Sequence, residues 1–240
     1  MYNYWVDWEE FNLIKDFVQP QDQVADVGTN MGFYTIWFSK FINETGKIHC
    51  FEPDEANFRK LEDNCRLNQL QNVCLNNIAV GNQSGIVSFT LGLDGENHIA
   101  SEEDKNTQTV LITKLDDYCE KNNIHQLAYA KVDIEGFEFD FLAGASVLLS
   151  QKRIDIIQIE INEQIRHSGK TIDELLRLIQ ESGYQLCKYD TEVKTLYPVQ
   201  YQPERENYFL VADLIRANAS IKQNNFIYNL PTHQPTPSQI

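Results

Sequence analysis

The sequence predicts a doubly wound α/β fold, in which a mostly parallel sheet is covered by helices on both faces. Three observations lead to this prediction. Short apolar runs alternate with helical patterns through most of the chain. A glycine-containing turn, residues 26–32, follows the first of these runs. A later run, Arg153 to Ile161 (RIDIIQIEI), is dense in isoleucine, as strands are when both faces of their sheet are covered.

The composition suits one well-buried domain, because 42% of the 240 residues are hydrophobic. We divide the chain into an N-terminal helix (1–21), the α/β domain (22–213) and a polar, proline-containing tail (214–240). No apolar run approaches the roughly 18 residues of a membrane span, and the first ten residues lack the features of a signal peptide. The 5 cysteines form no CxxC pair, so we expect buried free thiols in a cytoplasmic protein.

The charge balance bears on the partners. The chain has 20 basic and 35 acidic residues, which give a formal net charge of -15. Such an excess of negative charge opposes the counterion release that dominates binding to nucleic acid. We therefore expect no nucleic-acid partner, whereas the charge is compatible with a small-molecule substrate. A solvated surface is the usual cause of such an excess, and the oligomeric state leaves no signal in the sequence.

The first half of the chain contains two βα units. A helical pattern over 7–18 ends before Pro20. The first unit is a strand over 23–27 followed by an apolar helix over 33–42, and the second is a strand over 47–51 followed by a helix that ends at Asn68. The elements expected next are a strand over 73–80, an antiparallel strand over 85–91 and a polar loop over 92–108.

The second half continues the alternation. A fourth strand over 127–135, a helix over 138–150 and the isoleucine-rich strand over 153–161 come first. Thr171 and Glu174 form a capping box that opens a further helix, and Gly183 suits its C-terminal end. The last two strands, over 184–189 and 207–212, have no helix between them, so we expect them to form a hairpin.

The turn after the first strand is the first candidate site, because ligands of doubly wound sheets bind beyond the carboxyl ends of the strands. Gly28 and Gly32 let the backbone turn sharply and approach a ligand. A dinucleotide fingerprint would need further glycines where Asn30 and Phe33 stand. The turn therefore disfavours a nicotinamide-dependent oxidoreductase and suits a ligand with a carboxylate and a ribose. An ordinary tight turn is the structural alternative.

Two further strand ends extend this site. Glu52 follows the second strand, 24 positions beyond Gly28, near the interval at which an acidic side chain meets ribose hydroxyls. A solvated loop glutamate is its structural alternative. Asn77, Ile78 and Ala79 stand where an adenine edge would fall, although the apolar members suit a core equally well.

The fourth strand ends in alternating ionisable residues. Lys131, Asp133 and Glu135 share one face of the predicted strand, and Glu160 ends the next strand. A structural ion pair between Lys131 and Asp133 is one interpretation, and a ligand site is the other. The acidic residues also suit Mg²⁺, which prefers oxygen ligands. We predict no metal, because a cationic cofactor would already give these carboxylates a partner.

Together these residues resemble the FkbM family of S-adenosylmethionine-dependent methyltransferases. The hallmarks of that family are a D-V-G-x-N-x-G-x-Y-T turn, an F-E-P strand end and a K-x-D-x-E-G-x-E segment. They stand here, in order, as DVGTNMGFYT (26–35), FEP (51–53) and KVDIEGFE (131–138). The similarity spans roughly residues 22–161.

The resemblance implies a Rossmann-like class I methyltransferase fold, with a mostly parallel seven-stranded sheet whose last strand is antiparallel. It also implies S-adenosylmethionine as cofactor and O-methylation of a hydroxyl on a sugar, lipid or polyketide-type secondary metabolite. By motif position, the turn would surround the methionine part of the cofactor, and Glu52 would bind its ribose. Asn77 and Ala79 would border the adenine, and Asp133 would lie near the amino and sulfonium end. The residues assigned to the cofactor are Asp26, Gly28, Asn30, Met31, Gly32, Thr35, Glu52, Asn77, Ala79 and Asp133.

Methylation of an alcohol also calls for a general base, because the hydroxyl loses its proton. Glu135 and His98 are the candidates, and His167 is a third. Each has a structural alternative: His98 as a loop histidine and Glu135 as an acceptor that positions its loop. A non-catalytic protein that binds S-adenosylmethionine without transferring its methyl group is the alternative to an enzyme.

Overall fold

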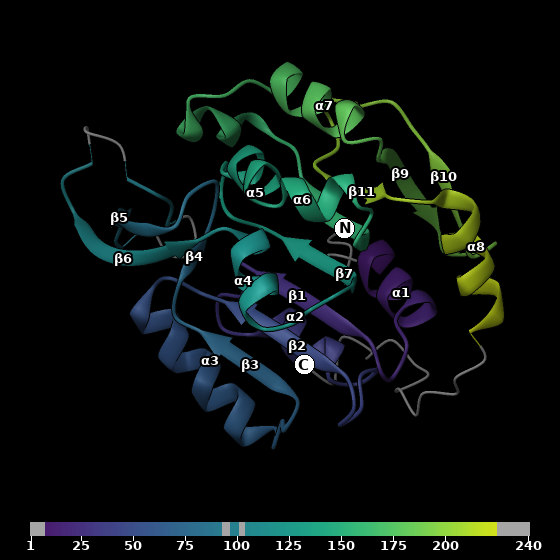
Figure 1. The fold of residues 1–240 in the computed structure, drawn as a ribbon, viewed down its shortest axis with the longest axis horizontal. Coiled ribbons are helices and arrows are strands. Elements are labelled where there is room, and N and C mark those ends of the chain that lie inside the picture. The colour runs from purple at the N-terminus through teal and green to yellow at the C-terminus, as the bar shows by residue number, and fades with distance from the viewer. Residues whose placement is uncertain (1–7, 93–96, 101–103, 225–240) are drawn as a thin grey trace, which may run out of the picture.

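The structure is a computed structural model, and it describes residues 8–92, 97–100 and 104–224. Within these residues the strands form one eight-stranded and one three-stranded sheet (Figure 1). The order of the main sheet is β10-β9-β11-β8-β7-β1-β2-β3. Its strands are β1 (Gln23–Val27), β2 (Lys47–Phe51), β3 (Val73–Asn76), β7 (Leu127–Val132), β8 (Ile154–Glu160), β9 (Gln185–Asp190), β10 (Thr195–Pro198) and β11 (Asn207–Val211).

The central strands of the main sheet are parallel. β1 pairs with β2 on one side and β7 on the other, β2 continues to β3, and β7 to β8, all in parallel. The chain order therefore reverses direction between β1 and β7, which is the point where ligands of such sheets bind. The predicted α/β class with a mostly parallel sheet is confirmed.

The main sheet has eight strands where we expected seven, and the connections at its far end also differ from the prediction. β11 is antiparallel to both β8 and β9, so the predicted antiparallel last strand is present. The true hairpin, however, joins β9 to the unpredicted edge strand β10, and β11 inserts between β9 and β8. The short run Thr195–Pro198 ends in a proline, which disfavours a strand except at an edge such as this one.

The three-stranded sheet comes from a segment whose middle we expected to be a loop. Its strands are β4 (Ala79–Val80), β5 (Gly85–Thr90) and β6 (Thr107–Thr113), in the order β4-β6-β5. The predicted strand over 73–80 is wrong as a single element, because the chain leaves the main sheet after Asn76 and joins the small sheet at Ala79. In Figure 1 the small sheet projects from one side of the main sheet.

Helices cover both faces of the main sheet, because alternate strand residues feed two separate cores. Val24 of β1 belongs to one core, and Ala25 and Val27 belong to the other. The first core includes residues of α1 (Trp8–Phe17), α2 (Phe33–Phe38), α3 (Glu55–Leu67) and α8 (Leu214–Gln223). The second includes residues of α4 (Leu115–Lys121), α5 (Glu138–Gly144), α6 (Ser146–Ser150), the 3-10 helix η1 (Glu163–Ser168) and α7 (Ile172–Glu181).

Helix boundaries follow the predictions with three exceptions. The capping box of α7 is present, since the Thr171 side chain accepts from the backbone of Glu174 and the Glu174 side chain accepts from the backbone of Thr171. The helix predicted over 33–42 ends at Phe38, and the helix predicted over 138–150 divides into α5 and α6 at Ala145. The third exception is the predicted tail, which begins with α8 rather than with irregular chain; residues 225–240 lie outside the described residues.

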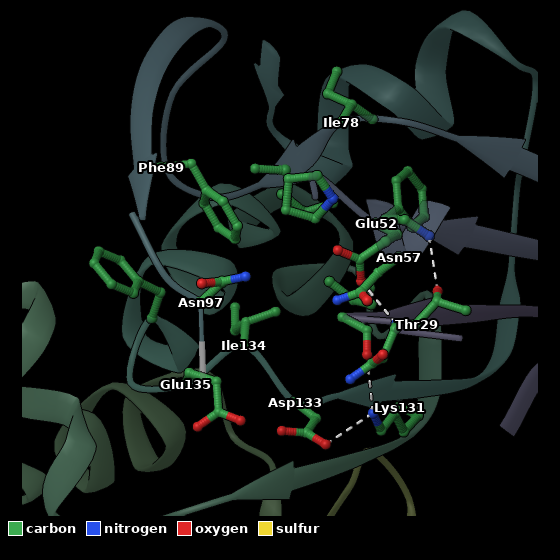
Figure 2. A pocket seen from close by; sticks show the side chains of 18 of the residues that line it. Thr29, Glu52, Asn57, Ile78, Phe89, Asn97, Lys131, Asp133, Ile134 and Glu135 are labelled. Atoms are coloured by element: carbon green, nitrogen blue, oxygen red, sulfur yellow. Dashed lines mark hydrogen bonds and ion pairs between the residues drawn. The ribbon is translucent and has the colours of Figure 1, made fainter. Parts of the chain in front are cut away.

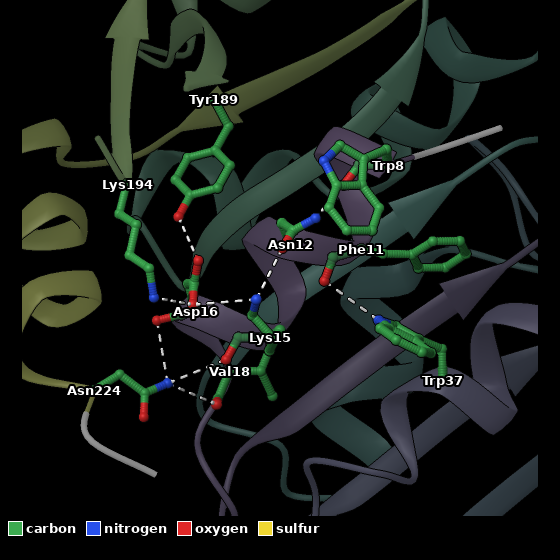
Figure 3. Close-up of polar contacts among 10 residues, drawn as sticks. All are labelled: Trp8, Phe11, Asn12, Lys15, Asp16, Val18, Trp37, Tyr189, Lys194 and Asn224. Atoms are coloured by element: carbon green, nitrogen blue, oxygen red, sulfur yellow. Dashed lines mark hydrogen bonds and ion pairs between the residues drawn. The ribbon is translucent and has the colours of Figure 1, made fainter. Parts of the chain in front are cut away.

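Contacts around Asp16 join the N-terminal helix to the edge strands and to α8, which begins at the N-cap residue Asp213. The side chain of Asp16 in α1 accepts hydrogen bonds from the Tyr189 hydroxyl (2.8 Å) and from Lys194 Nζ (2.9 Å) (Figure 3). Asn224, at the end of α8, donates its side-chain N–H to the backbone oxygen of Asp16 (3.1 Å). Ala217 and Ile221 of α8 are buried in the same core as α1. These contacts join the N-terminal helix, the edge strands and α8.

The described residues contain no helix that is long and apolar enough to cross a membrane. All 5 cysteines are free thiols, as predicted, and Cys74 alone among them is only partly buried.

Candidate functional site

A cavity of about 320 Å³ lies at the carboxyl ends of the parallel strands, beside the switch between β1 and β7 (Figure 2). Its walls come from the turn after β1, the end of β2, strands β4 and β5, the segment 97–99 and the turn after β7. Of the predicted cofactor residues, six line it: Gly28, Asn30, Met31, Glu52, Ala79 and Asp133. We call it the cofactor cavity.

The turn after β1 is built from left-handed backbone. Gly28, Asn30 and Gly32 all have positive φ, of 74°, 52° and 92°. The N–H groups of Gly28 and Thr29 donate to the backbone oxygen of Phe51 (3.0 and 3.1 Å), so β2 holds the turn in place. This conformation brings the backbone of residues 27–31 to the cavity wall.

The other predicted residues of this turn support it from inside the protein. Asp26 and Thr35 are fully buried, and the Thr35 hydroxyl donates to Asp26 Oδ2 (2.7 Å). Burial raises the pKa of Asp26, although the Lys131 ammonium opposes the rise. Neither these two residues nor Gly32 line the cavity. The structure therefore places them under the turn, not at its surface.

Gly28 is the position in this turn that tolerates substitution least. A Cβ atom there would lie 1.8 Å from the backbone oxygen of Asp133. We expect Gly28→Ala to cost about 1 kcal/mol for the left-handed backbone and a further 1–3 kcal/mol or so for overpacking. Urea unfolding measures the loss. Gly169→Ala is the matched control, because Gly169 has φ +70° with nothing within 4 Å of its Cβ position. Equal losses in the two variants would show that the contact with Asp133 is unimportant.

Glu52 is a buried carboxylate held by backbone donors. It is 5% exposed, and it accepts from the N–H of Asn30 (2.7 Å) and of Asp54 (2.9 Å). Burial nevertheless raises the pKa of Glu52 to about 7, because desolvation outweighs these two bonds. Glu52 links the turn after β1 to the end of β2 and lines the cavity. A buried carboxylate in this position suits a ligand that donates hydroxyl protons.

The adenine-side residues separate into two groups. Ile78 and Ala79 line the cavity, as predicted for an apolar border. Asn77 is exposed and does not line it; its side-chain N–H donates to the backbone oxygens of Glu52 (2.8 Å) and Pro53 (3.2 Å). Asn77 therefore holds the strand end that carries Glu52.

Lys131 and Asp133 form the predicted ion pair. Lys131 Nζ lies 3.0 Å from Asp133 Oδ2 and donates to the backbone oxygen of Gly28 (3.3 Å). The ion pair of the structural interpretation is therefore present. Both side chains also line the cofactor cavity, so the pair leaves them available to a ligand as well.

Glu135 does not share the strand face with Lys131, because β7 ends at Val132 and Glu135 sits in a left-handed turn with φ 57°. Gly136 continues this turn, and the Glu138 carboxylate accepts from its N–H (3.3 Å). Burial raises the pKa of Glu138 to about 7. Glu135 lines the cofactor cavity, and in Figure 2 it lies below Asn97 with its carboxylate pointing away from that residue.

The two candidate histidines meet beside this turn. The rings of His98 and His167 stack with their centroids 4.3 Å apart, and His98 also stacks on Phe137 (6.3 Å). Nδ1 of His167 donates to the backbone oxygen of Glu135 (3.0 Å). His98 lies in the predicted loop, outside any strand, and hydrogen bonds with the backbone and hydroxyl of Thr90 hold it beside the end of β5. Neither histidine lines the cavity, so Glu135 is the candidate base that the structure brings to it.

Sequence reasoning missed the wall that the small sheet supplies. Phe89 and Ile99 form an isolated bridge, and both line the cavity together with Asn97. The signal was the alternation of Thr107–Thr113 (TQTVLIT), which marks β6 as the partner of β5. Recognising that strand would have turned the expected loop into a hairpin over the site.

A second cavity, of about 530 Å³, lies beyond β8. Glu135 and Glu160 both line it, and Asn162 donates its side-chain N–H to Glu160 Oε1 (2.7 Å). In the described part of the chain, no three His, Cys, Asp or Glu side chains gather as a metal site would require. Asp133, Glu135 and Glu160 therefore do not form a magnesium ligand set in this structure.

Comparisons with known proteins agree with this geometry. The sequence profile described as "Methyltransferase FkbM domain" matches residues 26–186. The hexuronic acid methyltransferase AglP of Haloferax volcanii is 24% identical over 187 residues, which are 77% of this chain and 70% of that protein. The structure of a predicted rRNA methylase from Clostridium thermocellum superposes with a TM-score of 0.52 at 13% identity, over 84% of this chain and 92% of that one. At that identity the likeness shows the fold.

Proposed function

The chain belongs to the FkbM family of methyltransferases, and we propose that it transfers the methyl group of S-adenosylmethionine to a hydroxyl group of a small acceptor such as a sugar, lipid or secondary metabolite. The observation that carries this proposal is that two glutamate carboxylates line the same cavity. Glu52, a buried carboxylate, lines one part of it, and Glu135, a carboxylate in a left-handed turn, lines another.

The residues of the cofactor cavity fit S-adenosylmethionine. Glu52 would accept the ribose hydroxyl protons, since each of its oxygens keeps a lone pair beside its backbone donor. Ile78 and Ala79 would border the adenine, and the backbone around Gly28 would meet the methionine part. Asp133 would face the cationic end. When bound, the cofactor supplies a methyl group that its sulfonium charge has already activated.

Glu135 is the base in this proposal. The acceptor hydroxyl must lie within about 3.2 Å of a group that takes its proton. Glu135 reaches the cofactor cavity, and the backbone of its turn is fixed by Glu138 and His167. His98 acts as a positioning residue, because it stacks on His167 and on Phe137 without lining the cavity.

The nicotinamide alternative has less support from the site. A dinucleotide carries a pyrophosphate, and the second glycine of its fingerprint lets the backbone approach that group. Here Asn30 occupies the second position and lines the cavity, and Phe33, 67% exposed, stands where the third glycine would allow close packing of helix and strand. The turn offers the ligand a side chain where the pyrophosphate would need close approach of the backbone.

Release of S-adenosylhomocysteine from a panel of hydroxyl acceptors tests the proposal. We expect acceptor-dependent release, with transfer to oxygen identified by mass spectrometry and NMR of the product. Binding of S-adenosylmethionine without release from any sugar, lipid or phenolic acceptor would instead support the non-catalytic alternative.

A further inference from the structure

The size of the cofactor cavity implies that the acceptor needs space elsewhere. At about 320 Å³ the cavity is near the lower end of the range for ligand pockets, about 300–1,000 Å³. One small molecule therefore fills most of it. The second cavity adjoins the first, because Glu135 lines both. An acceptor in the second cavity would present its hydroxyl to the proposed base, so this inference rests on the proposed function.

The walls of the second cavity carry mainly negative charge. Four carboxylates line it, from Glu135, Glu160, Glu163 and Glu206. Strand pairing fixes two of them close together: Asn207 lies opposite Glu160, and the N–H of Ile161 donates to the backbone oxygen of Glu206 (2.8 Å).

The protonation of Glu160 reflects this crowding. Burial raises the pKa of Glu160 to about 8, and the negative charges of Asp133, Glu135, Glu206 and Glu138 add to the rise. A site that disfavours the ionised form of its own glutamate would also disfavour an ionised carboxylate on a ligand.

The remaining lining residues suit hydroxyl groups. Tyr201 offers a phenol, whereas the side-chain N–H groups of Asn162 already donate to Glu160 and Gln164 and leave its oxygen as an acceptor. The Tyr208 hydroxyl fixes the loop of Tyr201, because it bonds the backbone N–H and oxygen of Gln202 (2.8 and 3.0 Å). Arg166 is the one basic residue among the described lining residues, and its Nε donates to the backbone oxygen of Glu163 (2.9 Å). Carboxylates outnumber this single guanidinium.

We propose that the second cavity binds the acceptor and selects a neutral or amino sugar, and that Glu160 and Glu206 reject acceptors that carry a carboxylate. Like charges repel more strongly beside the partly buried Glu160 than in bulk water, and Glu206, which is exposed, contributes less to that repulsion. This selectivity is the reverse of that expected from the name of the Haloferax volcanii relative, a hexuronic acid methyltransferase.

Matched methyl glycosides test the proposal: a neutral glucoside, the corresponding glucosaminide and the corresponding glucuronide. Calorimetric titration into the full chain saturated with S-adenosylhomocysteine measures binding without requiring turnover. We expect the glucuronide to bind at least about tenfold more weakly than the neutral glucoside. Glu160→Gln and Glu206→Gln should each narrow that difference, most at pH 9, where Glu160 is ionised. Glu181→Gln, on the exposed end of α7, is the control that should leave it unchanged.

Each outcome separates the selectivity from the proposed function. The charge selection would be overturned if the glucuronide bound as tightly as the neutral glucoside or more tightly. It would also be overturned if none of the three glycosides bound. If both glutamine variants kept the wild-type preference for the neutral glucoside, Glu160 and Glu206 would not be the residues that cause this preference. Preferential binding of the neutral glucoside without release of S-adenosylhomocysteine would support the selection and count against O-methylation of that sugar.

Discussion

We expect Glu52→Gln to weaken the binding of S-adenosylmethionine by about 10- to 100-fold, which corresponds to about 1.4–2.8 kcal/mol. The amide can accept with only one oxygen, whereas the buried carboxylate accepts from the backbone N–H groups of Asn30 and Asp54 and would also accept from the ribose hydroxyls. Calorimetric titration measures the change. Glu55→Gln is the control, because Glu55 lies on the exposed face of α3 three residues away.

Acidity should affect the same interaction. The pKa of Glu52 is about 7, so the carboxylate gains a proton as the pH falls from 8 to 6 and then loses an acceptor site for the ribose. We expect the affinity of the wild-type protein for S-adenosylmethionine to decrease over that interval. Glu138 and Glu160 titrate nearby, at about 7 and about 8, so the comparison with Glu52→Gln isolates the contribution of Glu52. An equal decrease in the variant would assign the pH dependence to those other groups.

We expect Glu135→Gln to lower kcat by about 100- to 10,000-fold, because in the proposed mechanism the acceptor hydroxyl would then have no base to take its proton. The affinity for S-adenosylmethionine should stay within about threefold of the wild-type value, since the fold of the turn depends on the backbone of Glu135 and on Glu138. Single-turnover kinetics with a reactive acceptor separate the chemical step from product release.

Two control variants show whether a loss of kcat is specific to Glu135. Glu181→Gln removes an exposed carboxylate from the end of α7 and should leave kcat unchanged. His98→Phe keeps a ring that can stack on His167 and should retain most of the activity, as a positioning role requires. Full turnover in Glu135→Gln would exclude Glu135 as the base, and loss of turnover in His98→Phe would point to His98 instead.

The sequence predicted the central sheet well because its signals are local. Gln23–Val27 and Lys47–Phe51 match the predicted bounds, since each run is apolar and ends at a turn. β6 and β10 were missed because their pairing decides their structure. Thr107–Thr113 forms a strand against β5, and Thr195–Pro198 forms one at the edge beside β9.

The site was predicted in the same way, by position along the chain. Strand-end reasoning identified Glu52, Asp133 and Glu135, and all three line the cofactor cavity. It did not separate residues that face the cavity from residues that support it. Asp26 and Thr35 belong to the same motif as Gly28, but they point into the protein, and only the three-dimensional turn reveals this.

Asn97 illustrates what sequence position alone does not supply. It comes from a polar stretch without periodicity, yet the Thr90 bonds to His98 hold it against the cavity. Contacts with Thr90 of β5, rather than a sequence motif of its own, place it there. The same holds for the contact between His98 and His167, which lie 69 residues apart in the sequence and stack in the structure.

Titration of the purified full chain with S-adenosylmethionine and, separately, with NADH tests the central claim most directly. The site described here predicts micromolar binding of S-adenosylmethionine and no measurable binding of NADH, because Glu52 suits a ribose while the turn after β1 does not suit a pyrophosphate. Preference for NADH, or failure to bind either molecule, would contradict the assignment of the cofactor cavity.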